Sequence, residues 1–105
     1  MEEAGLFGHE LMKDIIENFI ESYEQDIKSI KESLEKSDFK TMEKQVHKLA
    51  GTISTFHADI PFNIAKKLEQ DAHEMAGTEC NRDLETLEQV LLQMRDELEQ
   101  IKKNL

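Results

Sequence analysis

The chain has 105 residues, which fits one domain, and 38% of them are hydrophobic, enough for a single core of modest size. With 13 basic and 23 acidic side chains the net charge is −10, which argues against binding to nucleic acid or to an anionic membrane, because both require a basic surface. No apolar run reaches the length of a membrane span, the acidic N-terminus is unlike a signal peptide and the single cysteine gives no disulfide framework, so we expect a cytoplasmic protein.

The first predicted element is a long helix over residues 9–35, preceded by a short lead-in, residues 1–8, whose Leu6 and Phe7 are expected to pack over one end of the fold. At about 27 residues this helix would be about 40 Å long, so we expect long neighbours. Its apolar residues recur at three- and four-residue steps, the spacing of one helix face: Leu11, Ile15, Phe19, Tyr23, Ile27, Ile30 and Leu34.

The central helix is predicted over Phe39–Phe56, after a break in which Ser37 or Asp38 is expected to be the N-cap. Six apolar residues occupy an arc of roughly 80° on this helix. They are Phe39, Met42, Val46, Leu49, Ile53 and Phe56.

Residues 57–61 predict a turn and a restart, with Asp59 as a cap and Pro61 in the first turn of the third helix. This helix is expected to end before Gly77, a C′ residue, and its apolar face comprises Ile60, Ile64, Ala65, Leu68, Ala72 and Met75. Residues 77–81 are predicted to be a loop, and the last helix carries Leu84, Leu87, Leu91, Met94, Leu98 and Ile101.

These four amphipathic segments, joined by short connections, predict an all-α fold: an antiparallel up-down-up-down four-helix bundle that forms one domain over residues 1–105. A coiled-coil dimer is the competing interpretation, but four apolar stripes and three turns favour packing within one chain. We therefore expect a monomer.

His47 is the most informative of the four histidines. It lies about 120° from the middle of the apolar arc of the central helix, so we expect it to face solvent. Gly51 follows one turn later on the same face, although glycine inside a helix costs about 1 kcal/mol relative to alanine. Ala50 and Ser54 are also small, and we predict that these three residues form a docking surface beside an exposed imidazole.

The remaining reactive side chains have simpler interpretations. His9 begins a helix, His57 lies in a turn, His73 lies on a helix flank, and Cys80 is expected to be an incidental thiol in a loop. No pair of His, Cys or carboxylate positions has the spacing of a zinc site, so no metal site is predicted. The absence of a nucleotide-binding motif argues against an autonomous kinase.

An exposed imidazole flanked by lysines suits phosphoryl transfer through histidine. Neutral imidazole is a nucleophile near neutral pH, and the phosphoryl group that it accepts adds about two negative charges. Lys44, one turn before His47, is the first candidate to stabilise that charge, and Lys48 is the second. A partner with its own acidic, metal-bearing site would then supply most of the transition-state stabilisation.

In these residues the chain resembles a histidine-containing phosphotransfer (HPt) domain, the intermediate carrier of multistep phosphorelays. The family pattern places an aliphatic residue two positions and a glycine four positions after the histidine, and a Leu-Glu pair in the next helix. His47, Leu49, Gly51 and the pair Leu68-Glu69 are in register with it.

Two positions depart from that pattern. The lysine that usually follows the histidine by three residues is Ala50 here, so its charge must come from Lys44 or Lys48 or be missing. A glycine that is common ten residues after the histidine is His57, which affects the turn after the central helix.

The resemblance implies that Glu69 hydrogen-bonds the imidazole of His47 and fixes its tautomer. It further implies that His47 exchanges a phosphoryl group with aspartates of response-regulator receiver domains, or accepts it from a sensor histidine kinase. No cofactor of this chain's own is then expected, since the receiver would supply Mg²⁺.

Two other functions remain open from the sequence. A non-catalytic helical adaptor would use the small-residue face to bind a partner helix, with His47 incidental. A dimerisation bundle of a sensor kinase would be a stable dimer.

Overall fold

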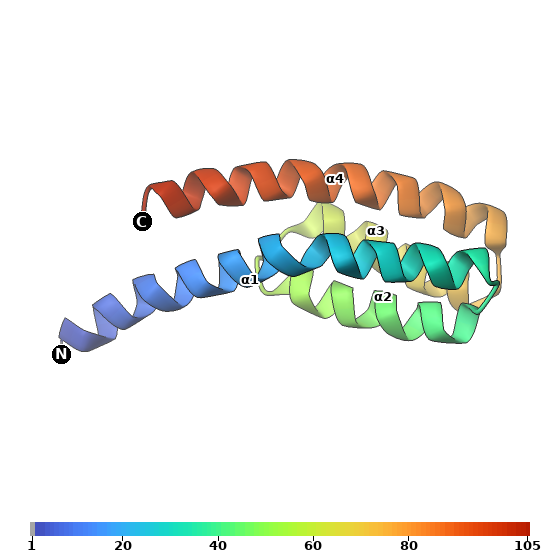
Figure 1. Ribbon diagram of the computed structural model, residues 1–105, viewed down its shortest axis with the longest axis horizontal. Helices are drawn as coiled ribbons and strands as arrows, with labels where there is room; N and C mark the ends of the chain where they lie inside the picture. The colour runs from blue at the N-terminus through green and yellow to red at the C-terminus, as the bar shows by residue number, and fades with distance from the viewer. Residues whose placement is uncertain (1) are drawn as a thin grey trace.

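The computed structural model describes the backbone of residues 2–105 and the side chains of residues 10–105. Within that range the chain forms four α-helices and no strand (Figure 1): α1 (Glu2–Glu35), α2 (Phe39–Ser54), α3 (Asp59–His73) and α4 (Gly77–Lys103). None of these helices is long and apolar enough to cross a membrane.

The helices pack in a ring in which each one contacts two others. The contacting pairs are α1 with α2, α2 with α3, α3 with α4, and α4 with α1. Short turns join antiparallel neighbours, as Figure 1 shows. The predicted all-α, up-down-up-down bundle is therefore confirmed.

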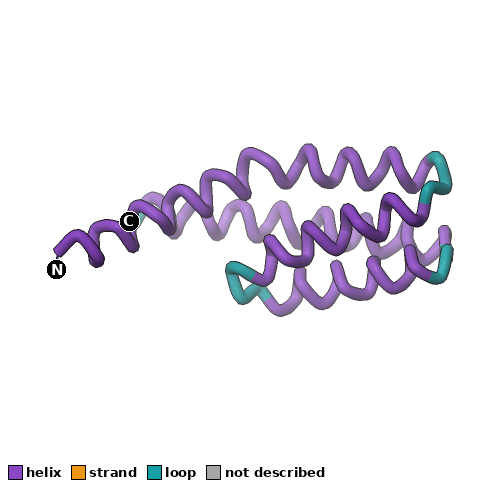
Figure 2. The backbone as a smooth tube through the Cα atoms, turned by 90° about the horizontal axis from the view of Figure 1, so that it is seen from below, coloured by secondary structure: helices purple, strands orange, loops and turns teal. Residues whose placement is uncertain are grey.

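The four helices differ in length, and this difference sets the shape of the molecule. The 34 residues of α1 give a rod of about 51 Å, which matches the longest extent of the chain, 50 Å. The 16 residues of α2 and the 15 of α3 reach only about half as far. Consequently α1 and α4 extend past the turn between α2 and α3, most clearly in Figure 2. The expectation of long neighbours for α1 holds for α4 alone.

The start of α1 differs from the prediction. The helix begins at Glu2, so the lead-in continues it, and acidic residues at positions 2 and 3 suit the positive end of a helix dipole. The expected packing of Leu6 and Phe7 lies outside the described side chains. Leu11 is 54% exposed because it lies on the extension beyond α2 and α3, whereas Ile16, one turn closer to the bundle, is fully buried.

The core contains most of the predicted apolar residues, drawn from all four helices: Ile16, Phe19, Tyr23, Ile27, Ile30, Met42, Val46, Leu49, Ala50, Ile53, Ala65, Leu68, Ala72, Cys80, Leu84, Leu87, Leu91, Met94 and Leu98. Ile60, Met75 and Ile101 are exposed instead. Met75 lies just after α3, and Ile101 lies on the part of α4 that extends past the α2–α3 turn, whereas Ile60 lies beside the buried face of α3, to which Pro61 and Ala65 belong. Phe56 lies just after α2, which ends at Ser54, and packs against the core at its edge.

Each of the three turns places a non-glycine residue in the left-handed region. Ser37, His57 and Met75 have φ angles of 55°, 54° and 55°. At Ser37 and Met75 the following residue's N–H donates back five residues to a helix carbonyl, the pattern of a Schellman end. Gly77 has no positive φ, so its predicted C′ role is wrong and Met75 occupies that position.

The helix starts also refine the predictions. Asp38 caps α2, because its carboxylate accepts from the Thr41 N–H at 3.3 Å. Hydrogen bonding with the side chain of Thr41, and then with this N–H, lowers the pKa of Asp38. Asp59 is not a cap: it is the first residue of α3, and Ala58 occupies the cap position without a side-chain bond.

Residues 77–81 are the first turn of α4 rather than a loop, and this places Cys80 inside the bundle. Its thiol is fully buried, and burial together with the carboxylates of Asp71 and Asp83 raises its pKa to about 11. Lys67 bridges those carboxylates, at 3.3 Å from Asp71 and 3.0 Å from Asp83. This ion bridge links α3 to α4, and its charges act on the Cys80 thiol.

Candidate functional site

His47 lies in the middle of α2, on the side that faces away from the core. Its side chain is 70% exposed, whereas Val46 and Leu49 on either side of it are buried. The prediction that His47 faces solvent is therefore confirmed. A partner that approaches the α2–α3 face has direct access to this imidazole.

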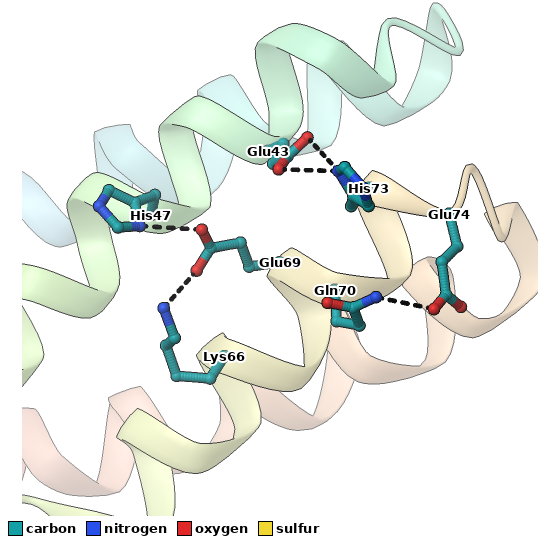
Figure 3. A network of polar contacts seen from close by, with 7 residues as sticks. All are labelled: Glu43, His47, Lys66, Glu69, Gln70, His73 and Glu74. Atoms are coloured by element: carbon teal, nitrogen blue, oxygen red, sulfur yellow. Dashed lines mark hydrogen bonds and ion pairs between the residues drawn. The ribbon is translucent and has the colours of Figure 1, made fainter.

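Glu69 of α3 lies opposite His47 and holds its ring. Nδ1 of His47 is 2.8 Å from Oε2 of Glu69 (Figure 3), so a neutral ring that donates from Nδ1 leaves the Nε2 lone pair available. No described side chain hydrogen-bonds Nε2. The contact that the resemblance implied for Glu69 is thus present, and it favours the tautomer that a nucleophilic Nε2 needs.

Lys66 is a functional candidate that the sequence reasoning missed. Its Nζ donates to Oε1 of Glu69 at 2.8 Å, so the two oxygens of this carboxylate are held by different partners (Figure 3). Burial raises the pKa of Glu69, but the hydrogen bonds from Lys66 and His47 outweigh that effect and hold it below its usual range. Glu69 is only 17% exposed and stays a carboxylate facing the imidazole.

The two lysines predicted to support the site lie in different places. Lys44 borders the same shallow hollow as His47 and Glu69, together with Lys40. Lys48 lies on the side towards α1, near Asp26. Burial raises the pKa of Asp26, and the positive charge of Lys48 partly offsets that increase. The geometry favours Lys44 over Lys48 as the cation beside His47.

The predicted docking surface divides into an exposed and a buried part. Gly51 and Ser54 are exposed, but Ala50 is buried in the core, so it cannot belong to that surface. A Cβ added to Gly51 would meet no atom within 4 Å, which means that no packing within this chain requires glycine there. The Ser54 hydroxyl donates to the Gly51 carbonyl at 2.7 Å and is satisfied within its own helix.

A second histidine–carboxylate pair lies beside the first. Nδ1 of His73 is 3.2 Å from Oε2 of Glu43, so α3 supplies the imidazole and α2 the carboxylate, the reverse of the first pair (Figure 3). Both pairs follow from spacing: Glu43 precedes His47 by four residues, and Glu69 precedes His73 by four. That repeated Glu-x-x-x-His spacing is the signal that would have revealed the second pair, and it shows that the expectation of no carboxylate–histidine pair at a metal-ligand spacing was wrong.

Among the described residues, no group of three or more His, Cys, Asp or Glu side chains is arranged to hold a metal ion.

Comparison with known proteins identifies the class. A family model described as the Hpt domain matches residues 14–104, nearly the whole chain. No curated protein and no solved structure matches the chain. The chain belongs to the Hpt domain family, and this membership implies histidine phosphotransfer in phosphorelay signalling.

Proposed function

We propose that His47 is the phosphoryl carrier of this domain. It accepts a phosphoryl group from a phospho-aspartate of a receiver domain, or from a sensor kinase, and passes it to an aspartate of another receiver. The observation that carries the proposal is the exposed His47 ring with Nδ1 bonded to Glu69 at 2.8 Å. Family membership supports the same chemistry.

The transfer step follows from the tautomer. The Nε2 lone pair of His47 attacks phosphorus, the bond between phosphorus and the acyl oxygen breaks, and the donor aspartate leaves as a carboxylate. The Nδ1 proton stays in the hydrogen bond to Glu69, so the positive charge that develops on the ring faces a carboxylate. Transfer to the second receiver reverses these bond changes.

Two lysines beside His47 suit a phosphoryl group. Lys44 and Lys40 border the hollow beside the imidazole, together with the carboxylates of Glu43 and Glu69, and the lysines reduce the cost of the added negative charge. In the proposal, Lys44 takes over the role of the lysine that Ala50 replaces. Mg²⁺ belongs to the receiver, whose acidic site would bring it to the phosphorus.

The docking surface in this proposal consists of Gly51, Ser54 and the exposed ring of His47. The missing Cβ at Gly51 lets a partner approach the backbone of α2 one turn from the nucleophile. Gly51 carries a helix-propensity cost of about 1 kcal/mol without any packing gain in this chain, which is reasonable if the gain comes in a complex.

The test is phosphoryl transfer from a panel of phosphorylated receivers with Mg²⁺, followed by intact mass. Wild type should rapidly gain one phosphoryl group that is acid-labile and base-stable, and His47→Gln should lose this rapid labelling. His57→Gln is the matched control, because it removes another exposed imidazole that has no carboxylate partner among the described residues. If His47→Gln is labelled like wild type, the proposal is wrong; if it also binds a partner normally, the adaptor function is favoured.

A further inference from the structure

The α2–α3 face carries two histidine–carboxylate pairs of the same design, related by an exchange of helices (Figure 3). His47 on α2 pairs with Glu69 on α3, and His73 on α3 pairs with Glu43 on α2. The imidazoles are equally accessible, at 70% exposed for His47 and 67% for His73. In each pair the carboxylate contacts Nδ1.

We propose that His73, held by Glu43, is a second phosphoryl-accepting site on this domain. A neutral His73 that donates from Nδ1 to Glu43 presents Nε2 as the nucleophile, as His47 does. The donor is an activated phosphoryl compound: an acyl phosphate in a relay, or phosphoramidate in the experiment that tests the site. Nε2 forms the bond to phosphorus, the acyl oxygen leaves as carboxylate, and the Nδ1 proton remains bonded to Glu43.

The surroundings of His73 indicate that it accepts a phosphoryl group more slowly than His47 does. Its contact with Glu43 is split between the two carboxylate oxygens, at 3.2 and 3.4 Å, and Glu43 is 34% exposed against 17% for Glu69. His73 also lies in the last turn of α3, where the negative end of the helix dipole disfavours a phosphoryl group.

Two cations lie near both sites. Lys40 borders the hollow that contains His47 and also a hollow that contains His73, and Lys66, bonded to Glu69 of the first pair, borders another hollow with His73. His73 contacts Glu43, which lies four residues before His47 and therefore about 6 Å along the axis of α2. A donor displaced by one turn along the α2–α3 face would consequently reach His73 instead of His47.

The experiment uses the full chain and phosphoramidate, a small phosphoryl donor that needs no docking and releases ammonia. Trypsin places each described histidine on its own peptide: Gln45–Lys48 for His47, Leu49–Lys66 for His57 and Leu68–Arg82 for His73. Labelling rates for all three sites therefore come from one digest, analysed at neutral to basic pH to preserve phosphohistidine. His57 is the internal standard for an exposed imidazole.

We expect His73 to be labelled about fivefold faster than His57. Residues that hydrogen-bond a metal-ligating histidine change affinity or activity by roughly 10- to 100-fold, and we expect a smaller effect here because Glu43 is partly exposed. Glu43→Gln should reduce the His73 rate to that of His57. Glu74→Gln is the matched control, since Glu74 is the residue next to His73 but hydrogen-bonds Gln70 at 2.7 Å, and it should leave the His73 rate unchanged.

Two results would overturn the proposal: equal rates for His73 and His57 in wild type, or a His73 rate that Glu43→Gln does not change. Nitrogen-15 NMR of the imidazoles gives a second readout, because His73 should show the Nδ1–H tautomer in wild type and lose that preference in Glu43→Gln. The His47 peptide in the same digest reports on the principal carrier, so failure at His73 is distinguishable from failure of the proposed function.

Discussion

At the scale of single residues, Glu69 determines the state of the imidazole in the proposed site. One of its oxygens contacts Nδ1 of His47 and the other contacts Nζ of Lys66, each at 2.8 Å. A carboxylate held at both oxygens has less rotational freedom, so it orients the ring better than a singly bonded one would. The site therefore comprises three residues from two helices.

Removing Lys66 tests this orientation. Lys66→Met should lower the rate of phosphoryl transfer through His47 by about threefold. The loss is modest because Glu69 keeps its contact with His47, and the fold should not change. Rapid-quench kinetics with a phosphorylated receiver measure the effect. Lys103→Met, at the end of α4, removes the same charge far from the site and should have no effect; equal losses in the two variants would point to net charge instead.

The lowered pKa of Glu69 gives a pH-dependent contribution to stability. A group whose pKa is lower in the folded state stabilises the fold above its unfolded pKa, and this contribution is lost as the pH falls through the folded value. The difference in unfolding free energy between wild type and Glu69→Gln should therefore be larger near pH 7 than at about pH 3. Urea titrations at both values measure it, with Glu97→Gln as the exposed control; a gap that is the same at both pH values would contradict the assignment.

At the scale of the helices, the turns explain one departure from the family pattern. His57 stands where the family commonly has glycine, and its φ of 54° is a conformation in which glycine has no steric penalty. The sequence shows the departure, but a backbone angle cannot be read from residue identity, so the left-handed conformation of His57 is visible only in the structure.

Relieving the left-handed residue should stabilise the domain. His57→Gly is expected to raise the free energy of unfolding by about 1 kcal/mol, as measured by chemical denaturation. His57→Ala separates the causes, because it removes the imidazole but keeps the Cβ and should give no gain. A gain in both variants would mean that the imidazole, rather than the backbone angle, is unfavourable.

At Gly51 we expect a substitution to increase stability and to impair function. Gly51→Ala is expected to stabilise α2 by about 1 kcal/mol, because the added Cβ meets open space, yet to weaken docking of a receiver. Denaturation and binding titrations measure the two effects. Thr86→Ala, an exposed helix position on α4, tests for a general effect of helix stabilisation and should leave binding unchanged. Unimpaired binding in Gly51→Ala would remove Gly51 from the docking surface.

At the scale of the whole molecule, apolar periodicity predicts the four helices, their order and most of the core. It fails for Leu11 and Ile101, which continue the stripes into the parts of α1 and α4 that α2 and α3 do not cover, and for Ile60, which lies beside the buried face of α3. Ala50 fails for another reason. Because α2 packs against both α1 and α3, its buried surface is wider than the arc of its large apolar residues.

The site was predictable to a similar extent. His47 stands out by its exposed angle and by Gly51, and family resemblance pointed to Glu69. Lys66 precedes Glu69 by three residues on α3, a spacing that makes two side chains neighbours, so its contact with Glu69 could have been predicted. Only the packing of α3 against α2 shows that Glu69 lies between Lys66 and His47.

The burial of Cys80 makes the only thiol of this sequence a reporter of conformational opening. A protonated, enclosed sulfur cannot attack a disulfide reagent until α3 and α4 separate, so the rate of thiol labelling under native conditions measures how often the bundle opens there. Lys67→Met, which removes the cation between Asp71 and Asp83, should accelerate labelling, whereas Lys103→Met should not. The same reaction, followed while His47 carries its phosphoryl group, would show whether loading the carrier changes the fluctuations of helices on the other side of the domain.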